Sequence, residues 1–93
     1  MIPRVGDELR FADGSVWVVA HVDDAKATIE SKHQRDRAGE ESRIAAAMGA
    51  DWRERYWRAV VTRKGFGSGS KQVDSVQAAM EGIELIQGHI EVG

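Results

Sequence analysis

The sequence predicts a single α+β domain over residues 1–93, with an antiparallel β-sheet of four or five strands and two helices in the order β-β-β-α-β-(β)-α. Three observations lead to this prediction. Short runs of β-branched and aromatic residues separated by turns fill the first third of the chain, another such run lies near the middle, and an apolar stripe with helical spacing follows it. The length and the ordinary share of hydrophobic residues, 42%, are typical of one globular domain.

The first hairpin is predicted from Asp13-Gly14, which lies between the runs 9–11 and 16–22. Asp-Gly favours a two-residue turn in which both residues have positive φ, and such a turn would pair Phe11 with Val16 and Leu9 with Val18. This register places one set of apolar residues on a common face, which would then form the core: Leu9, Phe11, Val16, Val18, Ala20 and Val22.

A second turn at Asp24-Ala25 would complete a three-stranded meander, because the next strand then brings Ala27 and Ile29 to the same face. The mixed-charge stretch that follows is predicted to be mobile as far as a short helix over roughly 39–48, which Gly49 would end.

The clearest strand is the run 55–63, which is rich in aromatic and β-branched residues. A final helix over 74–87 is predicted from Asp74 as its N-cap, Gln77 three residues later and an apolar stripe after them. Gly82 would then lie within this helix and allow it to approach the sheet closely. Under this helix we expect five residues to be buried: Val18, Ala20, Ile29, Trp57 and Ile83.

The glycine-rich segment 64–71 resembles a phosphate-binding loop in composition but not in order. A phosphate loop needs Gly-Lys-Ser/Thr directly at the start of a helix, whereas Gln72 follows Lys71 and the helix cap comes three residues later. We therefore expect a flexible loop that could contact a partner, through Lys64, Phe66 and Lys71.

No catalytic, metal-binding or cofactor-binding residues are predicted. Cysteine is absent, and His21, His33 and His89 are far apart with no ligand spacing. The lack of cysteine and of an apolar leader favours the cytoplasm, in a bacterial or phage-infected host cell, and no apolar run is long enough for a membrane partner. A net charge of -2 gives no general attraction to nucleic acid.

The outer sheet face is the predicted partner-binding surface, since the register would gather aromatic and cationic side chains there: Arg10, Trp17, His21, Tyr56 and Arg58. Such residues are typical of protein-binding hot spots. They would also suit single-stranded nucleic acid, with rings that stack on bases and cations that bind phosphates. In a third reading, the segment 31–53 folds over Trp17 and makes it part of the core.

Two resemblances add to this picture. Residues 57–83, with Trp57-Arg58-Ala59-Val60-Val61, the glycine turn and the segment from Asp74 to Ile83, resemble the strand, turn and helix of HicB-type antitoxins. In its small size, its acidity, its lack of cysteine and its sheet-plus-helix pattern, the chain is also similar to phage and mobile-element accessory proteins of the anti-CRISPR inhibitor kind. The second resemblance implies inhibition by occupying a surface of a host complex.

The function predicted from the sequence is therefore that of a small non-enzymatic binding protein that docks on a larger protein or nucleoprotein partner, as a phage-encoded inhibitor of a host defence complex would. The alternatives are a nucleic-acid-binding module that uses the outer sheet face, an antitoxin-like regulator, and a small hydrolase-like or ligand-binding domain. The sequence leaves open whether the chain forms a homodimer.

Overall fold

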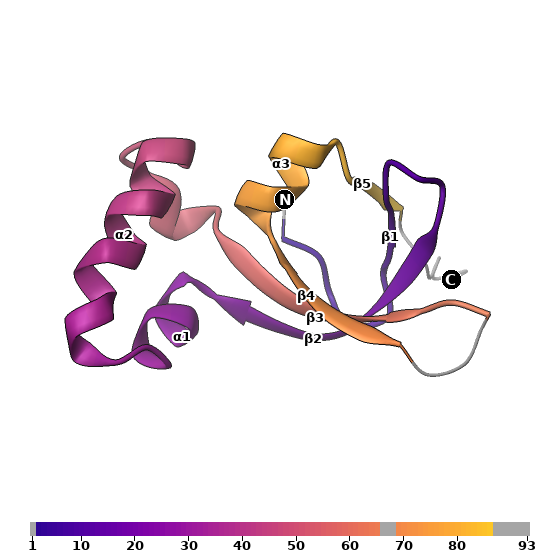
Figure 1. Cartoon of the computed structure of the whole chain (residues 1–93), viewed down its shortest axis with the longest axis horizontal. Helices are drawn as coiled ribbons and strands as arrows, with labels where there is room; N and C mark the ends of the chain where they lie inside the picture. The colour runs from indigo at the N-terminus through magenta and orange to yellow at the C-terminus, as the bar shows by residue number, and fades with distance from the viewer. Residues whose placement is uncertain (1, 66–68, 87–93) are drawn as a thin grey trace, which may run out of the picture.

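The computed structural model describes residues 2–65 and 69–86 (Figure 1). Its strands and helices follow in the order β1 (Glu8–Arg10), β2 (Val16–Asp24), α1 (Ala25–Glu30), α2 (Gln34–Met48), the 3₁₀ turn η1 (Trp52–Glu54), β3 (Trp57–Arg63), β4 (Ser70–Asp74), α3 (Ser75–Glu81) and β5 (Glu84–Ile86).

The strands form one antiparallel sheet in the order β4-β3-β2-β1-β5, which confirms the predicted α+β class. The sheet is curved, and α3 lies against its concave side, whereas α1 and α2 lie together beyond one end of the strands (Figure 1). The chain thus consists of a sheet with one short helix and a helical end group.

The main core lies on the concave side of the sheet. Because alternate residues of a strand share a face, the pairing of Leu9 with Trp17 and of Val19 with Val61 places all four side chains on this side. The buried members of the cluster come from four strands and the turn after β1: Leu9, Phe11, Val19, Trp57, Ala59, Val61 and Val73. Half-buried Ile83 and Leu85, from the α3–β5 segment, pack against it.

A second, smaller core fixes the helical end group to the sheet. It contains Ala25, Ile44, Trp52, Tyr56 and Val76, which come from α1, α2, η1, the residue before β3, and α3. The rings of Trp52 and Tyr56 meet edge to face, with their centroids 6.2 Å apart. Ile44 is the buried residue of α2, and half-buried Ala45 and Met48 pack beside it, so this long helix is attached through a few apolar side chains at its C-terminal end and the polar contacts described below.

The predicted register of the first hairpin is wrong by one residue, since Leu9 pairs with Trp17 and not with Val18. The connection is longer than a two-residue turn. The Phe11 N–H donates to the Ser15 carbonyl, and the Asp13 carboxylate accepts hydrogen bonds from both the N–H and the hydroxyl of Ser15. Trp17 and Val19 therefore face the core, and Val18 faces the opposite side.

The predicted third strand of the meander is a helix. Asp24 does not form a turn; its carboxylate accepts the N–H of Ala27 at 2.8 Å and caps α1. Within β2, Val19 pairs with Val61 and His21 with Val60, so Ala20 is the extra residue of a β-bulge. The bulge allows both Val19 and Val22 to face the core.

Of the five residues expected to be buried, Trp57 is buried, Val18, Ile29 and Ile83 are half-buried, and Ala20 is exposed. Ala20 is exposed because it belongs to the bulge, and Val18 is only half-buried because the register turns it away from the core.

Both predicted helices differ in length from the observed ones. The first already begins at Gln34, so charged residues that were expected to be mobile form its first turns, and it ends before Gly49 as predicted. Asp74 caps α3 and accepts the N–H of Gln77, also as predicted. Gly82, however, ends this helix in the left-handed conformation (φ 69°, ψ 35°) and lies in open space, after which the chain forms β5.

Candidate docking cleft

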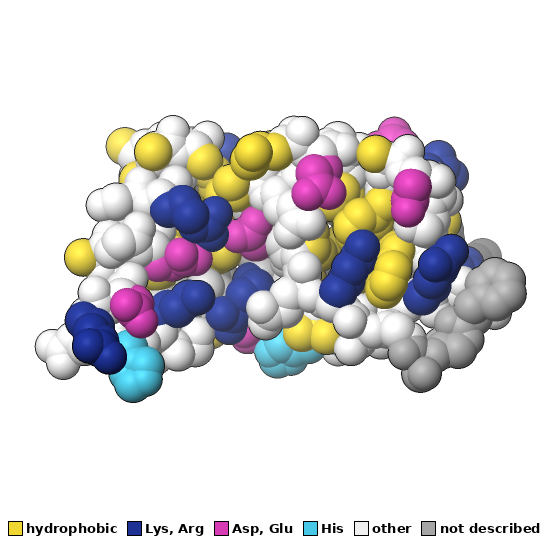
Figure 2. Space-filling view, in the orientation of Figure 1, with side chains coloured by type: hydrophobic (Ala, Val, Ile, Leu, Met, Phe, Trp, Pro, Cys, Tyr) yellow, Lys and Arg dark blue, Asp and Glu magenta, His cyan; other side chains and the backbone are white. Residues whose placement is uncertain are grey.

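A cleft of about 620 Å³ opens where α2 approaches β4 and α3. Figure 2 shows acidic and basic side chains intermingled over this part of the surface. The lining residues come from the α1–α2 corner, α2, β3, β4 and α3: Lys32, Glu40, Arg43, Tyr56, Arg58, Gln72, Val73, Asp74, Val76, Gln77, Met80 and Glu81.

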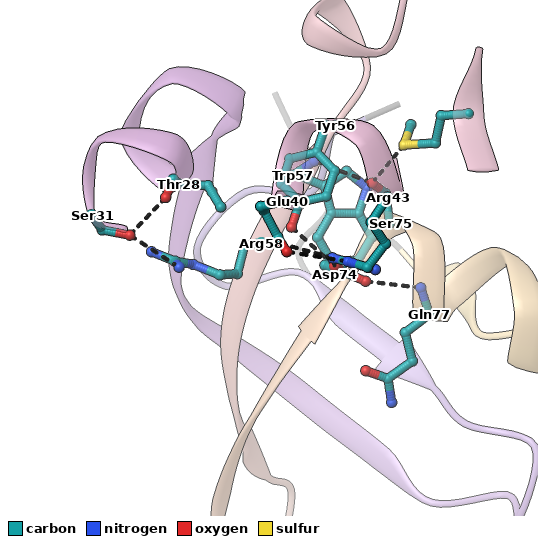
Figure 3. Close-up of polar contacts among 11 residues, drawn as sticks. Thr28, Ser31, Glu40, Arg43, Tyr56, Trp57, Arg58, Asp74, Ser75 and Gln77 are labelled. Carbon is teal, nitrogen blue, oxygen red and sulfur yellow. Dashed lines mark hydrogen bonds and ion pairs between the residues drawn. The ribbon is translucent and has the colours of Figure 1, made fainter. Parts of the chain in front are cut away.

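Asp74 is the centre of the polar network in this cleft (Figure 3). One carboxylate oxygen accepts the N–H of Gln77 at 2.8 Å, and the other accepts the Tyr56 hydroxyl at 2.9 Å and Arg43 Nη2 at 3.0 Å. Arg43 also makes a bidentate contact with Glu40, at 2.9 and 3.2 Å. The network joins α2, the start of β3 and the β4–α3 junction.

The electrostatics of the network keep each group in its usual ionisation state. Burial raises the pKa of Asp74, but hydrogen bonds from Gln77, Arg43 and Tyr56 outweigh it and hold that pKa below its ordinary value. Burial first, and then the charge of Asp74, raise the pKa of Tyr56 far above its ordinary value. The hydrogen bond from Arg43 lowers the pKa of Glu40. These shifts move each of the three pKa values further from pH 7, whereas a general acid or base works best with a pKa near the working pH.

Arg58 forms a second polar group beside the first. Its guanidinium donates to Asp23 at 2.7 Å. It also donates to the Ser31 hydroxyl at 3.3 Å, and Ser31 Oγ donates to the Thr28 carbonyl at 2.7 Å (Figure 3). The hydrogen bond from Arg58 is the main reason why the pKa of Asp23 is lowered. These contacts connect β3 with α1, so the arginines of the cleft are held in place before any partner arrives.

Three charged or apolar lining residues are left for contacts with a partner. Met80 is 81% exposed. The side chains of Lys32, at the α1–α2 corner, and of Glu81, the last residue of α3, make no hydrogen bond or ion pair with any of residues 2–65 and 69–86. The cleft therefore offers a cation, an anion and an exposed apolar side chain around a rigid polar centre.

The five residues predicted for one outer surface are divided between different parts of the fold. Trp17 faces the concave side, where it packs against Phe11, and Tyr56 is 1% exposed in the second core. Both departures follow from tertiary structure: the hairpin register turns Trp17 inward, and Tyr56 precedes the first paired residue of β3. Partner binding through this surface stays a prediction, but the expected cluster of rings and cations is not formed.

The other three predicted residues lie on the outer face or its rim. Arg10 pairs with Glu84 at 3.8 Å, and His21 lies 2.8 Å from Asp23, which also binds Arg58. Tyr56 and Arg58 are the members of the predicted set that line the cleft.

Of the three loop residues predicted to contact a partner, the structure describes two, Lys64 and Lys71. Lys64 pairs with Glu8, and Lys71 lies over the rings of Phe11 and Trp17, at 4.0 and 4.3 Å from their centroids. Phe66 lies outside the described residues.

Sequence reasoning missed Glu40, Arg43, Met80 and Glu81 as site residues. Glu40 and Arg43 belong to a helix that reads as a solvated charged surface, and the Arg43–Asp74 contact joins residues 31 positions apart. In the longer helix that the sequence predicts over 74–87, Met80 would belong to the apolar stripe that packs on the sheet, whereas α3 ends at Glu81 and Met80 is exposed. Asp74 carried a local signal, but only as a helix cap.

The part of the chain that the structure describes contains no group of three His, Asp or Glu residues arranged to hold a metal ion. Over the same residues, no helix has the length and apolar character needed to cross a bilayer. Comparison with known proteins identifies no relative, since no family model, curated protein or solved structure matches this chain.

Proposed function

We propose that this chain is a non-enzymatic binding protein that docks on a larger protein or nucleoprotein partner through the cleft between α2 and α3. The observation that supports this function best is a cleft whose polar centre is fixed internally and whose rim presents Met80, 81% exposed. Methionine is enriched in protein interfaces, and here it lies on the rim of a preformed polar cleft.

The rigidity of the cleft favours protein binding. Arg43 and Tyr56, two residue types that dominate interface hot spots, are already ordered by Asp74 and Glu40. Tyr56 itself is buried, so Arg43 is the group that a partner would meet already oriented, and less side-chain entropy would be lost on association than with a free side chain. The network remains accessible to a partner, because the Arg43 side chain is 47% exposed.

A more specific proposal follows from the resemblance of the chain to phage and mobile-element accessory proteins. The chain would work in the cytoplasm as a phage-encoded inhibitor that occupies a surface of a host defence complex. Nucleic acid is less favoured as the partner, because each arginine of the cleft is paired with a carboxylate and the rings of Trp17 and Tyr56 do not form an open stacking surface.

The test uses two matched substitutions of exposed apolar residues by an acid. Met80→Glu changes the cleft, whereas Val5→Glu changes a residue that is 66% exposed and does not line it. Tagged wild-type chain, both variants and a mock-tagged protein would be used for quantitative affinity capture from cells that naturally contain the chain. We expect a partner that wild type and Val5→Glu retain equally and that Met80→Glu loses by at least about tenfold, as for an interface anchor.

A partner retained by all three forms would contradict docking through this cleft. Capture of nucleic acid, with an affinity that falls steeply with salt concentration, would favour the alternative function.

A further inference from the structure

The outer edge of β4 has hydrogen-bonding groups that the sheet does not use. In β4, Ser70 lies opposite Thr62 and Gln72 opposite Val60. The hydrogen bond from the Arg63 N–H to the Gly69 carbonyl shows that the neighbouring pair is a hydrogen-bonded one, and hydrogen-bonded and non-hydrogen-bonded pairs alternate along an antiparallel ladder. The N–H and C=O of both Ser70 and Gln72 therefore point away from β3, toward the open edge.

No described residue occupies this edge. β4 is the terminal strand of the sheet, and the backbone groups of Ser70 and Gln72 have no partner among residues 2–65 and 69–86. Edge strands are often protected by an outward lysine. Lys71 does not serve this purpose here, because its ammonium lies over the rings of Phe11 and Trp17 on the concave side.

The open edge leads directly into the cleft, since Gln72, Val73 and Asp74 of β4 line it. A strand added to β4 would thus place its side chains between α2 and α3, where Lys32, Glu81 and Met80 are available. Glu81 lies in the last turn of α3, at the negative end of the helix dipole, so a cation brought to it is favoured by both charges.

We propose that the occupant of the cleft is an extended segment of a partner protein that adds a strand to the edge of β4 and carries an acidic, an apolar and a basic side chain for Lys32, Met80 and Glu81. This inference rests on the proposed function and specifies its recognition mode. Backbone hydrogen bonds to Ser70 and Gln72 supply general affinity, and the side chains in the cleft supply specificity, as in other cases of strand addition.

A second copy of the chain fits the cleft less well. Alternation along β4 places the side chains of Ser70 and Gln72 on the same face, and both are uncharged. If two β4 edges were paired around a twofold axis, these residues would offer no charged partner to Lys32 or Glu81. The charged residues of β4 are already engaged, Asp74 by Arg43 and Tyr56, and Lys71 by the rings of Phe11 and Trp17. Charge complementarity therefore favours a different protein.

The probe is a displayed library of random nine-residue peptides, selected on the immobilised full chain and measured afterwards as synthetic peptides. Gln72→Pro removes the outward N–H at a position where an edge strand tolerates proline. Gln72→Ala removes the side chain and retains the N–H. We expect selected peptides to bind Gln72→Pro at least about tenfold more weakly than Gln72→Ala, because one hydrogen bond is lost and a buried acceptor is left unpaired.

Two further measurements keep the test independent of the folding of one variant. In the complex with wild type, the amide protons of Ser70 and Gln72 should become strongly protected from exchange. Selection on the double variant Lys32→Glu/Glu81→Lys should return peptides with the reversed order of acidic and basic residues.

Equal affinity for the proline and alanine variants, with unprotected edge amides, would overturn strand addition, while a loss of binding on Met80→Glu would still support docking in the cleft. Peptides insensitive to both substitutions, or the recovery of no peptide at all, would count against the inference and the cleft together. Concentration-dependent dimerisation that Gln72→Pro abolishes would instead identify the occupant as a second copy.

Discussion

Replacing Asp74 by alanine should destabilise the chain far more than the equivalent change at Asp24. Both residues end a strand and cap the helix that follows, and each accepts a backbone N–H at 2.8 Å. Asp24→Ala therefore removes a cap alone, which costs about 1 kcal/mol. Asp74→Ala removes a cap as well, but it also leaves the Tyr56 hydroxyl without its acceptor and removes one of the two carboxylates that Arg43 contacts.

The additional loss can be worked out from the contacts. A buried hydroxyl without a partner costs about 1–2 kcal/mol, which applies to Tyr56 because this residue is almost fully buried. The ion pair with Arg43 contributes at most about 0.5 kcal/mol, because the arginine is half-exposed and solvent screens it. With the cap, the expected loss for Asp74→Ala is about 3 kcal/mol, a large part of the stability of a domain of this size.

Urea and thermal unfolding of the two variants provide the measurement. The thermal midpoint should fall by about 4–8 °C for Asp24→Ala and about 12–24 °C for Asp74→Ala. Equal losses would show that the polar network adds nothing beyond helix capping, and this would refute the account of the cleft as a rigid site.

The pH dependence gives a second check on the same variant. The pKa of Asp74 in the folded chain lies below its ordinary value of 3.8. The stabilisation is therefore complete above that ordinary value and is lost as the pH falls through the folded-state pKa. The stability difference between wild type and Asp74→Ala should be constant near neutral pH and become smaller below about pH 4. A difference that stays unchanged down to pH 2 would contradict an ionised Asp74.

Two further predictions concern single side chains and glycines. Trp17→Ala should lower the free energy of unfolding by about 2 kcal/mol, because the ring is half-buried against the main core. Arg58→Ala should lower it by about 1 kcal/mol, because the contacts with Asp23 and Ser31 are lost. Chemical denaturation measures both, and a larger loss for Arg58→Ala than for Trp17→Ala would contradict the observed register. Gly39→Ala, in α2 with open space around it, should raise the free energy of unfolding by about 0.5–1 kcal/mol. Gly82→Ala should lower it by about 1 kcal/mol, because the φ of Gly82 is 69°. Urea unfolding measures both, and shifts of the same sign would contradict a helical Gly39 beside a left-handed Gly82.

The features with local signals could be predicted from the amino-acid sequence. The strand of β3 follows from its β-branched and aromatic run, the end of α2 from Gly49, and the start of α3 from Asp74 and Gln77. Each of these depends on contacts within a few residues, such as a cap or a positive φ, so that the residue types themselves carry the information. The α+β class follows from the number and order of such segments.

Local signals were ambiguous where one residue type suits two structures. Asp24 can begin a turn or cap a helix, and only the packing of Ala25 against Ile44 and Trp52 favours the helix. Asp13-Gly14 suits a two-residue turn, but the hydrogen bonds of Ser15 to Asp13 lengthen the connection and move the register by one residue. Because side chains alternate along a strand, that single shift exchanged Trp17 and Val18 between the two faces.

The candidate cleft was decided by tertiary structure alone. Its central contacts join α2 to the β4–α3 junction across 31 positions and Tyr56 to Asp74 across 18. No local pattern shows that Arg43 of α2 will contact Asp74, the cap of α3. That contact depends on how α2 is positioned by the packing of Ile44 in the second core. The bulge at Ala20 and the open edge of β4 likewise arise only when the strands pair, since each is a property of the ladder and not of one strand.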